Sequence, residues 1–303
     1  MTERAVILAR GLGTRLRAAD GAARLTDEQQ HAADAGLKAL MPINGRPFLD
    51  YSLSTIADAG VRDVALVVAP EHEALKRRYT AVAAPSRLRL DFIVQPEALG
   101  TADAVLAIQD WAAREPFMVM NADNLYPSAA LRELAALEEP GLPAFDADDL
   151  VRSSNIPAER IAAFALIRVD ADGYLTSIVE KPRDAASERK GARRATAAGP
   201  GVFASERPGT SGMQRHGSAA DWSEPASRIS MNVWRFDARV FDACRDVPKS
   251  IRGEFELPEA VGLAASRGVR FRVIPARGPV LDLSRRADAA ELERRLRDVR
   301  PNP

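Results

Sequence analysis

The sequence is short of cysteine and lysine and has no excess charge of either sign. Cys244 is the single cysteine in 303 residues, which excludes an intramolecular disulfide and a thiolate metal cluster built from one chain. The 42 basic and 42 acidic side chains balance, which removes the long-range field of a general nucleic-acid or membrane-surface binder. Any cationic site must be built locally. Because only 5 of the 42 cations are lysines, a lysine within a motif is informative.

Long apolar runs are also missing. No stretch of about 18 apolar residues occurs, and the N-terminus passes from MTER directly into AVIL without the apolar region of a signal peptide. We therefore expect a cytoplasmic protein that has no membrane partner and no nucleic-acid partner. The 46% of apolar residues can fill a large core in a chain of this length.

Short apolar runs alternate with helical patterns in the first half of the chain. The predicted strands lie at 5–8, 64–68, 88–94 and 117–120, and the predicted helices at 48–59, 71–82 and 101–113. Such alternation predicts an α/β fold with a parallel sheet covered on both faces. Ligands of such sheets bind beyond the carboxyl ends of the strands. We therefore expect the loops at 9–17, 95–103 and 121–127 to share one rim.

The second half is less regular. A hairpin is predicted from 160–170 and 174–182, joined by the turn at Asp172 and Gly173. Residues 185–226 are rich in Gly, Ala, Ser, Arg and Pro, which predicts a mobile loop. Further elements are expected at 229–237, 257–267, 270–274, 280–283 and from 287 onward. The C-terminal strand and helix could support a homo-oligomer, although the sequence has no self-complementary seam.

Two glycines follow the first strand. Gly11 and Gly13, with Thr14 and Arg15 after them, would let the backbone approach a ligand and offer N–H groups and a cation to phosphate oxygens. The spacing fits neither the P-loop nor the dinucleotide fingerprint, since Leu16 holds the third glycine position. A simple turn between strand and helix remains an alternative.

Two aspartates and a lysine are candidates for charge chemistry. Asp123 follows an apolar strand, where a carboxylate could hold Mg²⁺ with phosphate oxygens, or cap a turn. Asp282 lies within the apolar run VLDL, where an unpaired charge is costly, so we expect a metal or a cationic partner. Lys38 could point along the rim or into solvent. His31, His72 and His216 have no metal-site spacing and are expected in surface or loop positions.

Seven segments occur in an order that resembles the sugar-1-phosphate nucleotidyltransferase family, which includes glucose-1-phosphate thymidylyltransferases and mannose-1-phosphate guanylyltransferases. The segments are ARGLGTRLR, LKALMPI, QPEALGTAD, NADN, EKP, MN and LDL, between Val6 and Leu283. The resemblance implies a Rossmann-like, mainly parallel sheet with helices on both faces and a smaller, β-rich sugar-binding part. It implies one domain over residues 1–303, with a nucleotide-binding half at about 1–127 and a sugar-binding half at about 128–303.

The resemblance also implies a reaction and a role for each residue. An NTP and a sugar 1-phosphate would give an NDP-sugar and pyrophosphate with Mg²⁺ as cofactor, and the anionic nucleophile would need no general base. The catalytic set would be Arg15, Lys38, Asp123 and Lys181. The nucleotide would meet Ala9, Gly11, Gly13, Thr14, Gln95, Gly100 and Thr101. The sugar phosphate would meet Glu180, Lys181 and Asn232, and the metal would meet Asp123 and Asp282.

The sequence departs from the family pattern at four places. Arg10 replaces the usual second glycine, Ala39 replaces the proline after the lysine, and Ala122 replaces the glycine before the metal aspartate. Residues 18–37 form a longer stretch than expected, in which 26–35 could form a small helix over the site. These departures leave the base and the sugar open. They also leave open a noncatalytic nucleotide-sugar sensor and a nucleotidyltransferase with a non-sugar acceptor.

Overall fold

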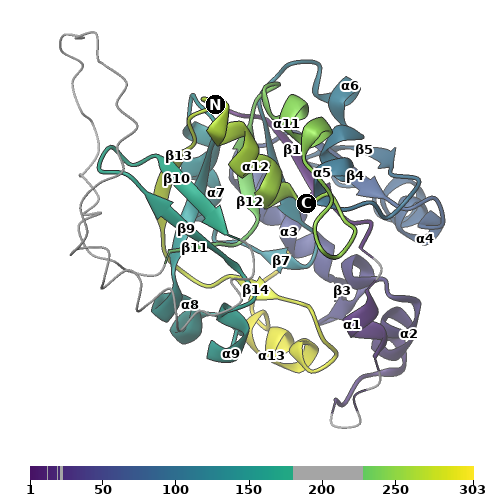
Figure 1. Cartoon of the computed structure of the whole chain (residues 1–303). Coiled ribbons are helices and arrows are strands. Elements are labelled where there is room, and N and C mark those ends of the chain that lie inside the picture. Colours follow the sequence, from purple (N-terminus) through teal and green to yellow (C-terminus); the bar gives the residue numbers. More distant parts are fainter. Residues whose placement is uncertain (12, 19, 21–22, 180–227) are drawn as a thin grey trace, which may run out of the picture.

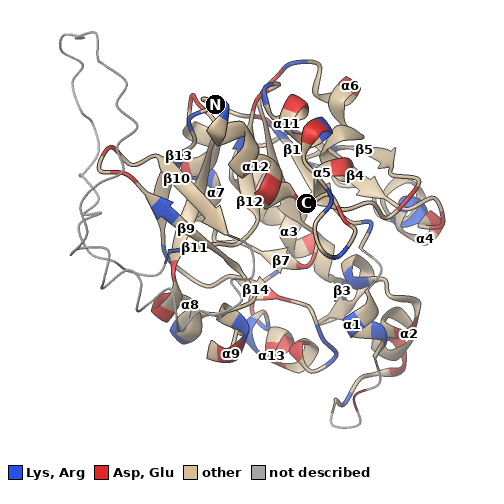
Figure 2. Ribbon diagram, in the orientation of Figure 1, with Lys and Arg blue, Asp and Glu red and all other residues tan. Residues whose placement is uncertain are grey.

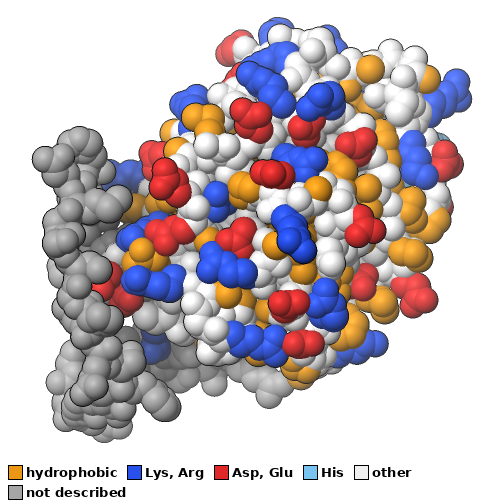
Figure 3. Space-filling model, turned by 90° about the horizontal axis from the view of Figure 1, so that it is seen from above, with side chains coloured by type: hydrophobic (Ala, Val, Ile, Leu, Met, Phe, Trp, Pro, Cys, Tyr) orange, Lys and Arg blue, Asp and Glu red, His pale blue; other side chains and the backbone are white. Residues whose placement is uncertain are grey.

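The computed structural model describes residues 1–11, 13–18, 20, 23–179 and 228–303. Glu180, Lys181 and the loop predicted at 185–226 lie outside the described residues. No described helix has the length and apolar character needed to cross a membrane. Acidic and basic side chains are interspersed along the ribbon and over the face seen from above, in keeping with the balanced composition (Figures 2 and 3).

The first half forms the predicted parallel sheet. Strands β1 (Arg4–Leu8), β4 (Asp63–Val68), β5 (Arg89–Val94) and β6 (Phe117–Asn121) lie in the order β5-β4-β1-β6, and all of them pair in parallel. The connecting helices are α3 (Phe48–Asp58), α4 (Glu73–Arg77) with the π-helical turn η2 (Arg78–Val82), α5 (Thr101–Leu106) and α6 (Gln109–Ala112). The single helix predicted at 101–113 is thus two short helices.

The second half extends the same sheet with antiparallel strands. Strand β12 (Val233–Phe236) pairs with β6, and β8 (Gly141–Asp146), β11 (Arg228–Ser230), β9 (Ala165–Val169) and β10 (Leu175–Val179) follow. Strand β13 (Arg272–Ala276) pairs with β8 in parallel. The predicted hairpin is confirmed as β9–β10, although residues 160 and 161, expected in its first strand, belong to a short helix and residues 180–182 lie outside the described residues. The run at 229–237 is broken between β11 and β12, where Asn232 has φ 55°. The ten-stranded sheet is therefore mixed, with a parallel Rossmann-like core.

Helices cover both faces of this sheet (Figure 1). Alternate residues of β1 separate the two apolar clusters, because Ile7 packs with residues of α3 and α7 (Ser128–Ala136), whereas Val6 packs with residues of α5, α11 (Val240–Asp246) and α12 (Leu257–Ser266). This is the two-sided burial expected of continuous apolar strands.

A smaller layer lies beside the carboxyl edge of the parallel strands. It contains α1 (Thr14–Arg17), α2 (Asp27–Ala35), η1 (Lys38–Leu40), β2 (Pro42–Ile43), β3 (Arg46–Pro47), β7 (Asn124–Leu125), α8 (Ala147–Ser153), α9 (Ala158–Ile161), β14 (Leu281–Asp282) and α13 (Asp288–Arg295). Leu16, Met41, Phe48 and Leu283 share a third apolar cluster there. The small helix expected at 26–35 is confirmed as α2, which begins with a capping box between Thr26 and Gln29.

Candidate active site

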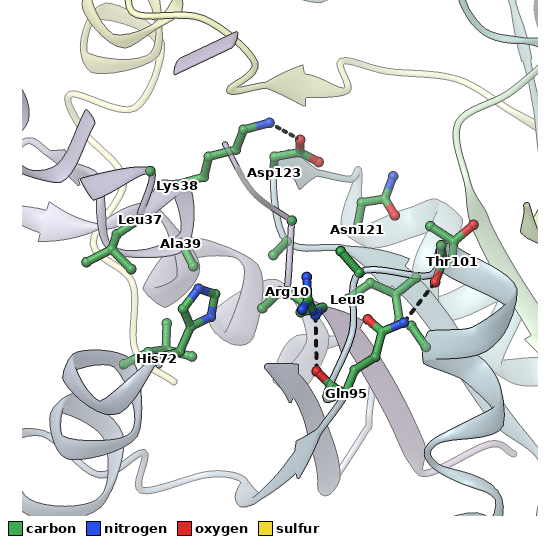
Figure 4. A pocket seen from close by; sticks show the side chains of 18 of the residues that line it. Leu8, Arg10, Leu37, Lys38, Ala39, His72, Gln95, Thr101, Asn121 and Asp123 are labelled. Atoms are coloured by element: carbon green, nitrogen blue, oxygen red, sulfur yellow. Dashed lines mark hydrogen bonds and ion pairs between the residues drawn. The ribbon is translucent and has the colours of Figure 1, made fainter. Parts of the chain in front are cut away.

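A pocket of about 390 Å³ opens at the carboxyl ends of β1, β5 and β6 (Figure 4). Loops that are far apart in the sequence meet there, as the rule for parallel sheets predicts. The lining residues are Leu8, Ala9, Arg10, Gly11, Thr14, Gly36, Leu37, Lys38, Ala39, His72, Leu75, Gln95, Ala98, Gly100, Thr101, Ala104, Asn121, Ala122, Asp123 and Glu254. Eight of the predicted site residues are among them: Ala9, Gly11, Thr14, Lys38, Gln95, Gly100, Thr101 and Asp123.

The two glycines of the first loop have different surroundings. An added Cβ at Gly11 would meet nothing within 4 Å, so this side of the loop is open to a ligand. Gly13 has φ +62°, and its Cβ would lie 2.6 Å from the carbonyl oxygen of Gly36. Gly13 does not line the pocket. It allows the loop to lie against the end of α2, whereas Gly11 faces the cavity.

Helix α1 is fixed from the C-terminal part of the chain. Arg286 donates from Nε to the carbonyl of Leu16 at 2.8 Å and from Nη2 to that of Arg17 at 3.1 Å. The same guanidinium contacts Asp34 of α2 at 2.7 Å. Arg15 lies on this short helix with an exposed side chain and does not line the pocket. Its predicted contact with phosphates stays a prediction.

Lys38 and Asp123 form an ion pair at the rim of the pocket. Lys38 Nζ lies 2.8 Å from Asp123 Oδ2, and the two side chains are 20% and 26% exposed. Lys38 comes from η1, just after α2, and Asp123 lies two residues after the end of β6. Of the two orientations left open for Lys38, the rim is therefore the correct one. Both charges remain accessible from the cavity (Figure 4).

The opposite wall is the segment that follows β5. Gln95 is 2% exposed, and its Nε2 donates to the Gly100 carbonyl at 3.1 Å and to Asp103 Oδ2 at 2.7 Å. Arg10 donates to the carbonyls of Gln95 and Pro96, both at 3.1 Å. The side chain that replaces a family glycine therefore makes a loop contact and leaves Gly11 open.

Gly100 is sterically required in this wall. It has φ +115°, and an added Cβ would lie 2.4 Å from the carbonyl oxygen of Phe255. Thr101 Oγ1 accepts a hydrogen bond from the backbone N–H of Leu257 at 2.8 Å. The segment after β5 is thus held from one side by Arg10 and from the other by the start of α12.

Asp282 lies beside Asp123 in the backbone but has other partners. Strand β14 pairs with β7, and the N–H of Leu283 donates to the carbonyl of Asp123 at 2.8 Å. The side chain of Asp282 is 4% exposed, forms an ion pair with Arg160 and accepts from Ser284 Oγ at 2.9 Å. Arg160 also contacts Asp288 at 3.0 Å. Arg160 is thus the cationic partner expected for a buried carboxylate. The metal-binding role of Asp282 stays a prediction.

Asn232 is placed at the same edge of the sheet. It precedes β12, whose Val233 is opposite Met120 of β6. Tyr126 Oη donates to the carbonyl of the adjacent Met231 at 2.8 Å. Asn232 Oδ1 is buried without a hydrogen-bond partner among the residues that the structure describes. Such a group calls for an explanation, and the family resemblance implies a sugar hydroxyl as its partner.

Three polar lining residues were not identified as site residues from the sequence: His72, Asn121 and Glu254. His72 lies in the loop before α4, in keeping with the expected surface or loop position, but it is half-buried in the pocket wall. Burial lowers its pKa, with smaller contributions in the same direction from Arg10, Arg17 and Lys76, while Glu71 opposes them. Its position shortly after β4, at the ligand-binding edge, is the signal that could have found it.

The comparison with known families agrees with this geometry. The family profile described as "Nucleotidyl transferase" matches residues 4–273. The chain belongs to this nucleotidyl transferase family. Membership makes it a nucleotidyltransferase.

Curated relatives match over nearly the whole chain. UTP–glucose-1-phosphate uridylyltransferase AglF of Haloferax volcanii is 24% identical over 97% of this chain and 96% of the relative. A glucose-1-phosphate thymidylyltransferase of Mycolicibacterium smegmatis is 26% identical over 91% of this chain and 75% of the relative. Among solved structures, a UDP-glucose pyrophosphorylase complexed with UDP-glucose superimposes with a TM-score of 0.69, 15% identity and coverage of 99% and 100% of the two chains. That likeness shows the fold.

The donor set of this nucleotidyltransferase suits a hard divalent cation bound jointly with substrate. Among the described residues there is no group of three or more His, Cys, Asp or Glu side chains that could hold a metal by itself. Mg²⁺ in phosphoryl-transfer sites is held by one or two carboxylates together with substrate phosphates and water. Asp123, accessible at the rim beside the open face of Gly11, fits that requirement.

Proposed function

We propose that this nucleotidyltransferase transfers a nucleotidyl group from an NTP to a sugar 1-phosphate, releasing pyrophosphate, with Mg²⁺ as cofactor. The observation that carries the proposal is the shared pocket, in which the open glycine Gly11, the Lys38–Asp123 pair and the buried amide of Gln95 line one cavity. The same acceptor class is supported by two relatives, a UTP–glucose-1-phosphate uridylyltransferase and a glucose-1-phosphate thymidylyltransferase.

The pocket can perform this reaction by positioning and charge neutralisation. The backbone at Gly11 and Thr14 would receive the triphosphate, and Lys38 and Arg15 would offset its charge. A phosphate oxygen of the acceptor would form a bond to the α-phosphorus while the bond to the departing pyrophosphate breaks in line. Because that oxygen is already anionic, no residue has to remove a proton.

Asp123 would hold the metal ion, which supplies charge neutralisation on the phosphates when bound. In the substrate complex Lys38 would then exchange its carboxylate partner for phosphate oxygens. On the acceptor side, Glu180, Lys181 and Asn232 would bind the sugar phosphate. Asp282 would be a second carboxylate at the metal. Arg10 does not fill the open side of Gly11, so the departure that suggested a noncatalytic sensor leaves the pocket usable.

The test is a substrate matrix with the purified full chain. UTP, dTTP, GTP, ATP and CTP are each combined with Mg²⁺ and a panel of sugar 1-phosphates, and pyrophosphate release and product mass are measured. We expect turnover with at least one pair and an NDP-sugar as the product. Nucleotide binding without pyrophosphate from any pair would refute the proposal in favour of the sensor. Product formed only with non-sugar phosphates would refute the acceptor class.

A further inference from the structure

Asp103 binds the side-chain amide of Gln95, a residue that lines the pocket. It lies on α5 and is absent from the residues that line the pocket. Its Oδ2 accepts a hydrogen bond from Gln95 Nε2 at 2.7 Å, and the Gly100 carbonyl accepts a second hydrogen bond from the same nitrogen at 3.1 Å. A primary amide has two N–H donors on one nitrogen. Both donors of Gln95 are therefore used within the protein.

The amide cannot easily turn over. A carboxylate and a carbonyl only accept hydrogen bonds, so a rotation by 180° would bring Gln95 Oε1 against two other acceptors. It would also leave a buried N–H₂ group without its partners, which costs about 1–3 kcal/mol per lost partner. The orientation seen in Figure 4, with the nitrogen toward Thr101 and the oxygen on the side of Arg10, is thus the stable one.

The backbone of Gln95 is fixed as well. The guanidinium of Arg10 donates to two consecutive carbonyls, those of Gln95 and Pro96. A planar guanidinium that spans two acceptors holds their relative direction better than a single donor does. The remaining free group is Gln95 Oε1, which has no hydrogen-bond partner among the described residues.

We infer that Asp103, with Arg10, makes Gln95 an acceptor-only reader of the nucleobase, so that the site selects NTPs whose base has an N–H within the ring. Uracil, thymine and guanine have this donor. Adenine and cytosine have a ring nitrogen lone pair at the corresponding position, which would face Oε1 as a second acceptor. Asp103 is then a positioning residue that determines specificity. The inference rests on the proposed function, because it assumes that the base meets Gln95.

Binding without an acceptor substrate tests this directly. Titration calorimetry of the full chain with Mg²⁺ and each of the five NTPs should give UTP, dTTP and GTP at least about tenfold tighter binding than ATP and CTP, since one well-placed base contact discriminates by about 1–3 kcal/mol. In Asp103→Asn the new side chain can present its amide to Gln95 Oε1, so that only the Gly100 carbonyl still opposes the rotated orientation. The ratio should fall toward one.

The matched control is Asp110→Asn, the same substitution at an exposed position of α6; it should keep the wild-type ratio. Asp103→Ser, whose hydroxyl both donates and accepts, should repeat the loss if Asp103→Asn folds poorly in a thermal-melting check. Equal binding of all five NTPs by the wild type, or an unchanged ratio in both Asp103 variants, would overturn the inference and leave the proposed function standing. Binding of none of them would instead overturn the proposed function.

Discussion

Two ion pairs lie next to each other at the edge of the sheet, and they differ in access. Lys38 and Asp123 are 20% and 26% exposed and line the pocket, whereas Arg160 and Asp282 are 14% and 4% exposed and are surrounded by Ser284, Asn124 and Asp288. A backbone hydrogen bond from Leu283 to Asp123 joins the two places. The accessible pair can exchange its partners for ligand atoms, while the enclosed acid is held by Arg160 and by hydrogen bonds from Asn124 and Ser284.

The largest effect is expected at the accessible pair. Asp123→Asn should lower kcat by roughly 100- to 1000-fold, the scale of a lost transition-state electrostatic contact. The melting temperature should change little, because a partly exposed ion pair contributes about 0–1 kcal/mol. Pyrophosphate release and thermal melting measure the two quantities. Asp58→Asn, which removes the exposed pair with Arg87, serves as the control and should keep full activity. Normal turnover in Asp123→Asn would remove this residue from the reaction.

At the enclosed pair we expect a substitution to lower the stability of the fold, in contrast to the small change in melting temperature expected at the accessible pair. Asp282→Asn leaves the buried Arg160 with Asp288 as its remaining carboxylate and should lower the free energy of unfolding by about 3 kcal/mol. Urea denaturation measures this change, and an unchanged midpoint would contradict the assignment. Arg160→Met breaks the same pair but keeps the acid. The kcat of both variants is measured at a temperature at which they remain folded. If kcat is lost in Asp282→Asn and kept in Arg160→Met, the carboxylate of Asp282 takes part in the reaction.

A smaller effect is expected where Arg10 supports the wall of the pocket. Arg10→Gly restores the residue of the family pattern but frees the carbonyls of Gln95 and Pro96. The KM for the NTP should rise about tenfold, since hydrogen bonds to charged groups contribute about 1.5–3 kcal/mol each and water replaces part of that. The kcat and the KM for the sugar phosphate should stay near the wild-type values. Arg10→Lys, which keeps a cation with a single donor group, should give a KM for the NTP between those of the wild type and Arg10→Gly. An unchanged KM for the NTP in Arg10→Gly would show that Arg10 does not support the pocket wall.

The smallest effect concerns the pH dependence of stability. Burial holds the pKa of His72 below the ordinary histidine value of about 6.5, so the unfolded chain binds its proton first as the pH falls. The neutral side chain therefore contributes fully above pH 6.5, and stability is lost as the pH falls from there toward the lower pKa of the folded state. His72→Gln should show a smaller drop in melting temperature on acidification across this range. An identical drop in both proteins would show that His72 does not titrate in this way.

The alternation of apolar runs and helical patterns was sufficient to predict the parallel core. Continuous apolar strands such as β4 can only be buried on both faces, and that requirement is local to each run. Helix α2 can also be predicted from local sequence, because Thr26 and Gln29 have the spacing of a capping box. The pocket followed from the same reasoning, since the loops after parallel strands meet at one edge.

The remaining features depend on contacts between distant segments. Arg160 stands 122 residues before Asp282 in a short polar helix, α9, and nothing in its neighbourhood indicates a buried partner. At the break at Asn232 the neighbours of the chain change from β9 and β8 to β8 and β6, and no local pattern encodes this change. His72 escaped attention for a similar reason: a single histidine at the start of a charged helix is indistinguishable from a solvated one until α4 is placed beside the pocket.

The way Arg286 and β14 reach back to the first loop has a practical consequence for making shorter versions of this protein. The family match ends at residue 273, which invites truncation close to that point. Such a truncation would remove Arg286, which donates hydrogen bonds to the carbonyls of Leu16 and Arg17, and strand β14, which pairs with β7. A trimmed protein would thus retain every strand of the large sheet except for the end of β13 and still lose the support of helix α1 and the loop before it. Expression boundaries should be drawn beyond α13.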